Sequence, residues 1–387
     1  MLYLCRVNER VMNTNINPFI VSGKIAPPYF CDRQAESDTL EKALSNQLNV
    51  VLTSPRRMGK TSLVSYVFDK PSIAGEYITI TVDILHTTTF REFIMTFGTA
   101  VFDAVASRSD RWRKLFVTAL KSLSASFGYD PVQNTPTFDV KLGDILRPEY
   151  TLGEIFEYLE KVDKRCLVVI DEFQQITRYP EKNTEALLRT HIQKLSNVNF
   201  VFSGSRRRLM EEMFFSAKRP FYQSAKALRL DAINRDIYRA FATDHFQKAG
   251  KELAADAFDL LYDTFWGVTF YVQRILKDAY GDTQEGTVCD TICIEELIKG
   301  YIEENDAHLR EQLSFITEAQ KELLYAVHAE GHVQSITSSA FTKRHRLRSP
   351  SSTQTAALKL LEYDMITRQE KVYSLSDPLL SLWLDRR

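Results

Sequence analysis

Apolar and polar positions in the first 230 residues follow a pattern that predicts strands separated by helices. Short apolar runs rich in β-branched residues predict four strands, over 47–53, 77–83, 166–170 and 199–203. Between these runs, apolar residues recur at helical spacing and predict helices from residue 61 onward and over 89–127, 152–162 and 183–195. The run at 166–170 is apolar throughout, which is typical of a central parallel strand covered on both faces. The alternation therefore indicates an α/β protein whose parallel sheet carries helices on both faces.

The pattern changes after residue 231, where the strand signals stop and several helices are expected up to residue 307. The remaining residues predict three helices and then a short β pair, over 319–329, 338–345, 352–363, 365–368 and 371–374. This order is typical of a winged helix, whose third helix we expect to be capped by Ser351 or Ser352. The sequence thus predicts four parts: an N-terminal extension (1–16), an α/β core (17–230), an α-helical lid (231–307) and a winged-helix domain (308–387).

Composition narrows the class of protein. The chain has 387 residues and a net charge of −1, so no global field draws it onto nucleic acid or an anionic membrane. No stretch approaches the roughly 20 apolar residues that a membrane span requires. The five cysteines are odd in number and mostly isolated, which favours reduced thiols and a cytoplasmic location over a disulfide framework.

A phosphate-binding motif lies between the first predicted strand and the helix after it. Its sequence runs Ser54, Pro55, Arg56, Arg57, Met58, Gly59, Lys60, Thr61 and Ser62. In such a loop the backbone N–H groups surround the phosphates, lysine reaches the β- and γ-oxygens, and the hydroxyl that opens the helix ligates Mg²⁺. Ser54 occupies the first position, where the motif normally has glycine. The alternative is a chance Gly-Lys-Thr sequence in an ordinary loop.

Two carboxylates follow the apolar strand at 166–170. Asp171 is expected to hold Mg²⁺ through water, and Glu172 to orient or deprotonate the attacking water. A helix N-cap is the alternative interpretation of this pair. We expect Lys60 and Asp171 to meet in one crevice, on the assumption that their strands are adjacent in the sheet.

The strand at 199–203 ends in polar residues that we expect to lie between those two strands. Ser205 is the candidate for facing the γ-phosphate, with Ser203 as a second candidate and ordinary turn residues as the alternative. An arginine directed at a neighbouring subunit's nucleotide could come from 206–208 or from Arg219, although a solvated basic helix start also explains 206–208.

Several strings together resemble the archaeal and bacterial P-loop ATPase family of the AAA+/STAND type. They lie at 17–19, 30–36, 54–63, 170–174 and 202–205, and the resemblance covers roughly residues 17–307. It implies a five-stranded parallel core, a helical lid, a C-terminal winged helix and ATP as ligand. It also implies that the segment ending in Arg33 approaches the adenine or ribose, and that a lid group near 267–273, or Arg274, contacts the nucleotide.

The leading hypothesis is a Mg²⁺-dependent ATP hydrolase with slow turnover, which acts as a molecular switch through its lid and winged helix. The alternative is a nucleotide-gated DNA-binding or scaffold protein with little or no hydrolysis. Lys343–Arg348 form a basic cluster before the third winged-helix helix, and this cluster could contact DNA phosphates. A protein partner or a second copy of the chain is the other expected contact.

Overall fold

The computed structural model describes residues 17–105, 108–122, 126–130, 135–139 and 145–386. The expected extension at 1–16 lies outside the described residues. The chain forms two compact units: one spans Ser22–Ile233, and the other joins the first residues, up to Val21, to Asn234–Arg387. Among the described residues, no helix is both long and apolar enough to cross a membrane.

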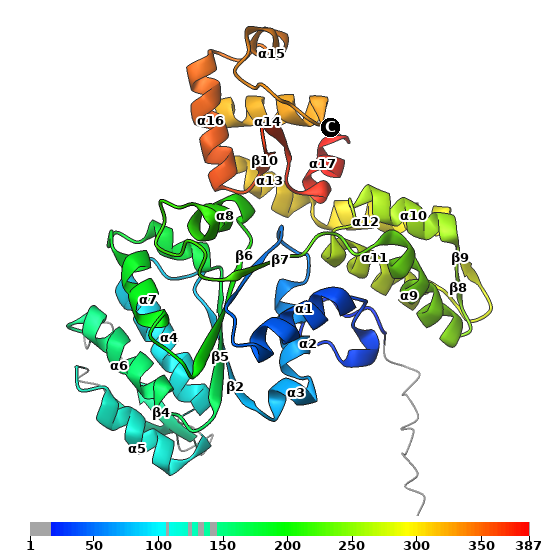
Figure 1. Cartoon of the computed structure of the whole chain (residues 1–387). Coiled ribbons are helices and arrows are strands. Elements are labelled where there is room, and N and C mark those ends of the chain that lie inside the picture. Colours follow the sequence, from blue (N-terminus) through cyan, green and yellow to red (C-terminus); the bar gives the residue numbers. More distant parts are fainter. Residues whose placement is uncertain (1–16, 106–107, 123–125, 131–134, 140–144, 387) are drawn as a thin grey trace, which may run out of the picture. The chain divides into compact units, whose positions relative to one another are not determined.

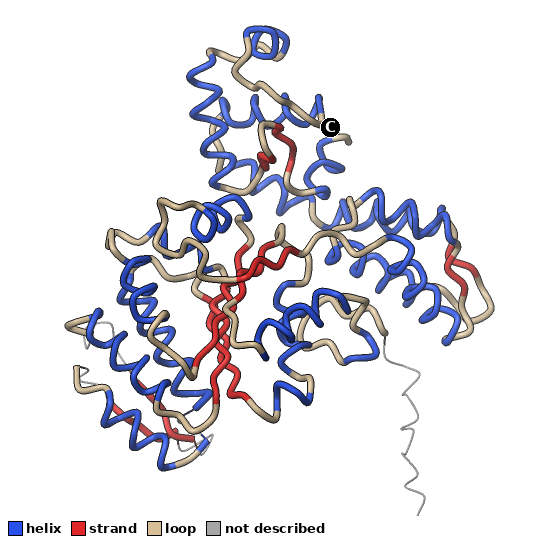
Figure 2. Tube along the Cα trace, in the orientation of Figure 1, coloured by secondary structure: helices blue, strands red, loops and turns tan. Residues whose placement is uncertain are grey.

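The first unit is built on a five-stranded sheet whose paired strands are all parallel (Figures 1 and 2). Its spatial order is β2 (Tyr77–Asp83), β5 (Arg165–Asp171), β6 (Val198–Gly204), β1 (Val50–Thr53) and β7 (Lys226–Arg229). Every residue of β1 and β6 is buried, as the continuous apolar runs predicted. The central strands therefore have helices over both faces.

Alternate side chains of the strands enter two separate hydrophobic clusters. Val168 and Ile170 belong to one cluster, whereas Leu167 and Val169 belong to the other, as the twofold period of a strand requires. The first cluster is covered by α4 (Phe90–Val105), α5 (Asp110–Ala119), α6 (Pro148–Glu160), α7 (Thr184–Ile192) and α8 (Arg207–Phe215). The second is covered by α1 (Gln34–Ser45), α2 (Lys60–Phe68) and α3 (Pro71–Ala74).

Two features of this unit differ from the sequence prediction. Strand β7 was not predicted, because only Leu228 of its four residues is buried and the pattern has no apolar run. The helix expected over 89–127 is two helices, α4 and α5, and the second ends at Ala119. A hairpin follows, formed by β3 (Ser126–Asp130) and β4 (Thr135–Asp139).

The lid region consists mainly of helices, as predicted: α9 (Arg235–Lys248), α10 (Ala255–Thr264), α11 (Thr269–Asp282) and α12 (Thr291–Glu304). The expectation that strands stop after residue 231 is wrong in one detail. Glu252–Leu253 (β8) and Val288–Cys289 (β9) form a short parallel pair. Each strand has two residues, and this is too short to produce a recognisable period in the sequence.

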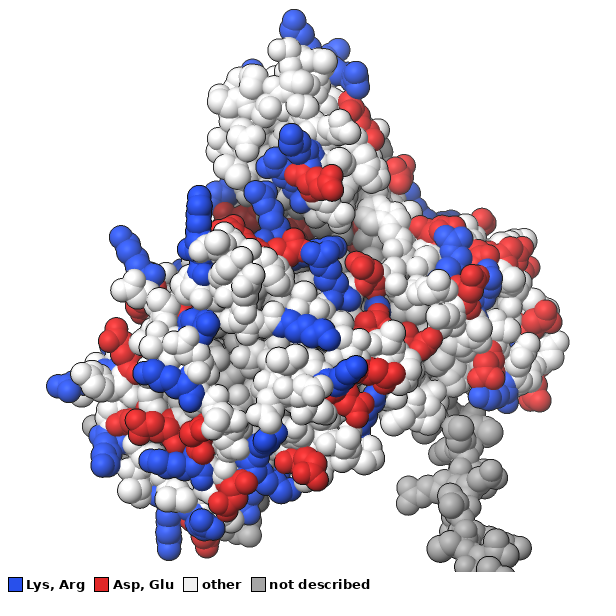
Figure 3. Space-filling model, viewed as in Figure 1, with Lys and Arg blue, Asp and Glu red and all other residues white. Residues whose placement is uncertain are grey.

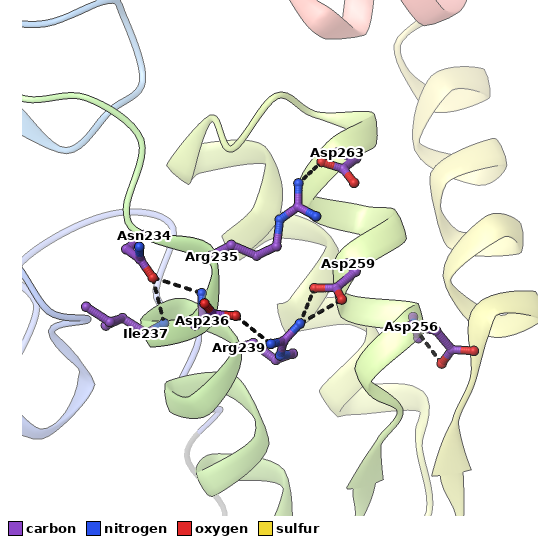
Figure 4. Close-up of polar contacts among 9 residues, drawn as sticks. Asn234, Arg235, Asp236, Ile237, Arg239, Asp256, Asp259 and Asp263 are labelled. Atoms are coloured by element: carbon purple, nitrogen blue, oxygen red, sulfur yellow. Dashed lines mark hydrogen bonds and ion pairs between the residues drawn. The ribbon is translucent and has the colours of Figure 1, made fainter.

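Polar contacts between α9 and α10 are shown in Figure 4. Arg239 donates to both carboxylate oxygens of Asp259 at 2.6 Å and also pairs with Asp236 at 2.6 Å. Asn234 caps α9, because its Oδ1 accepts from the backbone N–H groups of Asp236 at 3.0 Å and Ile237 at 3.3 Å. The cap satisfies donors that the first turn of a helix otherwise leaves unpaired.

Replacing Asn234 with alanine is expected to weaken the start of α9 by about 1 kcal/mol, because these donors lose their side-chain acceptor. Amide hydrogen exchange in the first turn of α9 measures the loss, which corresponds to roughly fivefold faster exchange. Asn234→Asp retains an acceptor and serves as the control. Equal exchange rates in the alanine and aspartate variants would contradict the assignment of the cap.

Residues 17–21 were expected to begin the ATPase core, but in the structure they group with the lid. Phe19 is fully buried, and its ring lies 5.8 Å from those of Phe246 and Tyr280. Asn17 donates from Nδ2 to the backbone oxygen of Lys277 at 2.7 Å. Burial of one such aromatic side chain contributes about 1.5–3 kcal/mol, which is enough to hold this short segment on α9 and α11.

The C-terminal residues form a winged helix with the predicted order of elements. It contains α13 (Asp306–Ser314), α14 (Glu318–Glu330), α15 (Ser339–Arg344), α16 (Pro350–Glu362), β10 (Ile366–Gln369), β11 (Val372–Leu375) and α17 (Pro378–Leu384). The α16 cap is Ser349, which accepts from the N–H of Ser352 at 3.2 Å, so the expected cap at Ser351 or Ser352 is wrong. Pro350 occupies the first helical position, where a missing backbone N–H costs no intrahelical hydrogen bond. The helix therefore starts earlier in the sequence than predicted.

One hydrogen bond joins the lid to the winged helix within the second unit, and another joins α17 to α13 inside the winged helix. The Tyr271 hydroxyl donates to Asp377 Oδ1 at 2.7 Å, although the Tyr271 ring itself is buried in the lid. Trp383 Nε1 donates to Asp306 Oδ1 at 2.8 Å. Because both acceptors are carboxylates, these bonds are of the stronger, charge-assisted kind.

Candidate nucleotide-binding site

The loop between β1 and α2 has the backbone conformation that phosphate binding requires. Gly59 has φ +87° and Arg57 has φ +66°, so two closely spaced residues occupy the left-handed region. Glycine adopts that conformation without strain, whereas arginine does so at a cost of about 1–3 kcal/mol. Strain of this kind is typical of ligand-binding loops. Helix α2 starts at Lys60, so its N-terminus opens directly from the loop.

The side chains of the loop divide into buried and exposed groups. Ser54 is fully buried, and Met58 and Lys60 are nearly so, whereas Pro55, Arg56 and Arg57 are exposed. Lys60 Nζ donates to Ser54 Oγ at 3.3 Å, and Ser54 Oγ donates to the backbone oxygen of Pro55 at 2.8 Å. Serine at the first motif position therefore binds the lysine and closes the turn. Ser62, the last residue of the motif, is half-buried on α2.

The two predicted metal ligands lie together at the carboxyl edge of the sheet. Thr61 Oγ1 donates to Asp171 Oδ2 at 3.3 Å, although the residues are 110 positions apart in sequence. The expectation that their strands are adjacent is wrong, because β6 lies between β1 and β5. The loop after β1 and the start of α2 bridge that extra strand. The polar end of β6 therefore lies between the two motifs, as predicted for Ser203 and Ser205.

Glu172 is held by two donors on one oxygen. Ser205 Oγ donates to Glu172 Oε2 at 2.8 Å, and Gln174 Nε2 donates to the same oxygen. Glu172 has φ +54°, so its backbone is in the left-handed region at the point where β5 ends. The alternative interpretation as a helix N-cap does not fit Glu172, because its side chain makes no cap hydrogen bond. Sequence reasoning missed Gln174: it belongs to the string at 170–174 that carried the family resemblance, but no role followed from it.

Arg33 lies behind the loop, where it supports the backbone. Its side chain is 5% exposed, and it donates to the backbone oxygen of Met58 at 3.2 Å and pairs with Glu36 at 3.0 Å. In the same segment, Phe30 stacks on Tyr66 of α2 with ring centroids 4.1 Å apart. The segment that was expected near the adenine or ribose thus packs against the loop and its helix, and a nucleotide contact by Arg33 stays a prediction.

Three of the other arginines that the sequence singled out are engaged in ion pairs. Arg207 pairs with Glu211 at 3.2 Å, and Arg219 pairs with Glu185. In the lid, Arg274 pairs with Asp278 at 3.1 Å. Any contact of Arg219 or Arg274 with a nucleotide would therefore first require these pairs to break.

The donor set fits a Mg²⁺-bound phosphate chain. A threonine hydroxyl and a carboxylate are the oxygen ligands that Mg²⁺ accepts, and the ion usually takes its remaining ligands from water and phosphate. A nearly buried ammonium group, a helix N-terminus and a glycine-containing turn add the positive field that phosphate requires. Every one of these groups belongs to the first unit, Ser22–Ile233.

Comparison with protein families and curated proteins gives two matches. A family model described as a probable winged helix domain matches residues 307–386. An uncharacterized ATP-binding protein of Methanocaldococcus jannaschii, MJ1659, is 26% identical over 165 residues, which cover 38% of this chain and 43% of that protein. The chain thus matches less than half the length of this curated relative.

Solved structures match almost the whole chain. The Walker-type ATPase PABY2304 of Pyrococcus abyssi aligns with a TM-score of 0.66 at 16% identity, over 95% of this chain and 99% of that one. The ORC2 protein of Aeropyrum pernix, solved in ADPNP and ADP complexes, aligns with a TM-score of 0.56 at 13% identity, over 96% of each chain. The ORC1 protein of the same organism, solved with DNA, aligns with a TM-score of 0.51 at 14% identity, again over 96% of each. The chain therefore has the fold of the P-loop ATPases that carry a C-terminal winged helix, as its motifs predicted.

Proposed function

We propose that the protein binds Mg·ATP between the P-loop and Asp171 and hydrolyses it with Glu172. One observation carries the proposal: the Thr61 hydroxyl lies 3.3 Å from the Asp171 carboxylate, and the neighbouring Glu172 carboxylate is fixed by hydrogen bonds. The likeness to an ATP-binding protein and to nucleotide-bound ATPase structures supports the same ligand.

Each residue has a separate role in this proposal. Lys60 moves from Ser54 to the β- and γ-phosphate oxygens, which are stronger acceptors than a hydroxyl. Thr61 and Asp171 would hold Mg²⁺, the latter through water, and the bound ion would neutralise charge on the phosphates. Glu172 orients or deprotonates the attacking water, and Ser205 turns its hydroxyl toward the γ-phosphate.

The proposal extends to a molecular switch. The lid and the winged helix belong to one unit and are joined by the bond from Tyr271 to Asp377. A change in the lid that follows the nucleotide state is therefore passed to the winged helix as a movement of one body. The winged helix then reports that state to a protein partner or to a second copy of the chain, which we place in the cytoplasm.

Steady-state phosphate release by the purified chain, with and without Mg²⁺, tests the proposal. Slow, Mg²⁺-dependent release that saturates with ATP is the expected result. Tight ATP binding without release would instead favour the scaffold alternative, in which the nucleotide is only a structural ligand. Neither binding nor release would end the nucleotide proposal altogether.

Binding to duplex DNA is the second candidate function, and the surface of the winged helix favours it. Lys343, Arg344, Arg346 and Arg348 are exposed around the turn from α15 to α16, and Figure 3 shows Lys and Arg atoms gathered over α15. Arg344 is paired with Glu330 at 2.6 Å, so part of this charge is neutralised. The exposed positions of α16 include Gln354 but no Arg or Asn to read base edges, which favours contacts with phosphates.

A triple variant tests this candidate. Replacing Lys343, Arg346 and Arg348 with glutamine is expected to weaken duplex binding and to lower the salt slope by about 3, because roughly 0.9 counterion is released per phosphate contact. Fluorescence anisotropy at several salt concentrations measures both quantities. The control variant carries glutamine at three exposed lysines of the first unit: Lys42, Lys161 and Lys182. Equal slopes in the two variants would rule out the basic turn as a DNA contact.

A further inference from the structure

Gln174 is a buried amide whose partner is the candidate catalytic carboxylate. It follows Glu172 by two residues in the 3-10 helix Phe173–Arg178, and it is only 5% exposed. Its Nε2 donates to Glu172 Oε2, and this orientation follows from chemistry, because a carboxylate can only accept. Its Oε1 is buried and has no hydrogen-bond partner among the described residues. A buried polar side chain with half of its capacity unused requires an explanation.

The space for this amide exists because residue 204 is glycine. A Cβ at Gly204 would lie 2.3 Å from Gln174 Oε1 and 2.7 Å from Met210 Cγ, and real Cβ atoms do not approach so closely. The backbone itself does not demand glycine there, because Gly204 is not among the residues with positive φ. The side chain of Gln174 therefore packs directly against Gly204 at the end of β6, where a residue with a Cβ would clash with it.

Gln174 and Ser205 share the same acceptor oxygen. Ser205 follows Gly204 directly and donates to Glu172 Oε2 at 2.8 Å. In the proposed reaction the Ser205 hydroxyl turns toward the γ-phosphate, and this removes one of the two donors. Gln174 is not expected to turn toward the γ-phosphate in this way, because its side chain is buried next to the Glu172 carboxylate. It is thus the donor that remains on Glu172 when nucleotide is bound.

We propose that Gln174 is a positioning residue, which holds the Glu172 carboxylate in its hydrolytic orientation and is itself seated by Gly204. This inference rests on the proposed function and deepens it, since it adds a residue that acts through the catalytic base. A carboxylate that must hydrogen-bond to one particular water requires a fixed orientation. A misplacement of the catalytic group by about 1 Å can lower the rate about a hundredfold. Gln174 supplies that orientation through its hydrogen bond to Glu172 Oε2.

Gln174→Met tests the inference, because methionine has similar volume but donates no hydrogen bond. The expected result is a fall in kcat of about tenfold to a hundredfold with an unchanged Kd for Mg·ATP. Gln175→Met is the matched control: Gln175 is the next residue, and its side chain donates to the backbone oxygen of Thr87, not to the Glu172 carboxylate. In the Glu172→Gln background, Gln174→Met should cause no further loss, because the group that it positions is already changed.

Gly204→Ala provides a second variant on the opposite side of the contact. Its new Cβ displaces the Gln174 amide, so kcat should fall in the same way while the Kd stays unchanged. A third readout needs no nucleotide: the side-chain ¹⁵N resonance of Gln174, assigned by its absence in Gln174→Met, should shift in Glu172→Gln. The shift is expected because the amide then faces a neutral acceptor.

The outcomes separate this inference from the function on which it rests. A wild-type chain that releases no phosphate overturns both. A wild-type chain that turns over while Gln174→Met keeps its kcat overturns the positioning role alone. Loss of ATP affinity in parallel with kcat, additive losses with Glu172→Gln, or an unshifted Gln174 resonance would also overturn it, because each means that the amide does not act through Glu172.

Discussion

The Lys60→Ala variant is expected to bind Mg·ATP about tenfold to a hundredfold more weakly than the wild type. Lys60 is 8% exposed at the start of α2, and its ammonium group is directed at Ser54 Oγ inside the loop. A buried, charge-assisted hydrogen bond contributes about 1.5–3 kcal/mol, and binding moves this interaction from a serine hydroxyl to phosphate oxygens. Titration with a fluorescent ATP analogue in the presence of Mg²⁺ measures the affinity.

Lys42→Ala is the matched control for this experiment. Lys42 lies exposed on α1 in the same unit, so its loss changes the net charge equally but removes nothing from the loop. An affinity in Lys60→Ala equal to that of Lys42→Ala would place the nucleotide elsewhere. Both variants should unfold like the wild type, because neither removes an apolar side chain from the core.

The Glu172→Gln variant is expected to keep its ATP affinity and to lose turnover by about a hundredfold to ten-thousandfold. The amide has nearly the same shape as the carboxylate, so Ser205 can still donate to its oxygen, but it cannot accept a proton from water. Single-turnover phosphate release measures the chemical step, and equilibrium titration measures binding. A loss of kcat without a loss of affinity is the signature of a group needed only in the transition state.

Glu157→Gln is the control, since Glu157 is exposed on α6 and lies outside the motifs. Unchanged phosphate release in Glu172→Gln would overturn its assignment as the catalytic base. The same variant also provides a means of finding the partner. A chain trapped with ATP should hold its client, so proteins that co-purify with Glu172→Gln but not with Lys60→Ala are candidates for it.

Most of the fold could be predicted because buried parallel strands have an unmistakable composition. The run ending at Ile170 is apolar at every position, and β2 was placed with the bounds that the structure gives it, Tyr77–Asp83. Strand β7 was not predicted, because it is an edge strand and three of its four residues are exposed. Its backbone pairing therefore leaves no apolar run in the sequence. The lid pair β8–β9 is too short for any period.

The residues of the phosphate-binding loop could be placed from the sequence, because their motif fixes the backbone. The hydrogen-bond partners of individual side chains could not be predicted. Gly59, Lys60 and Thr61 follow a strand and open a helix, so their placement followed from the sequence alone. The meeting of Lys60 with Asp171 was expected on an incorrect strand order, and the contact that the structure shows is between Thr61, the next residue, and Asp171, with β6 lying between their strands. The contact of Gln174 with Glu172 depends on the missing Cβ at Gly204, and this relation appears only when two distant segments lie side by side.

A crystal structure of the chain with Mg²⁺ and a non-hydrolysable ATP analogue tests the central claim most directly. The account predicts phosphate density against the N–H groups of the loop up to Thr61, and a metal ion between the Thr61 hydroxyl and the Asp171 carboxylate. The Thr61–Asp171 hydrogen bond should then be replaced by a direct contact of Thr61 to that ion and a water-mediated contact of Asp171. Analogue bound away from this crevice, or a loop that stays empty at saturating concentration, would contradict the account.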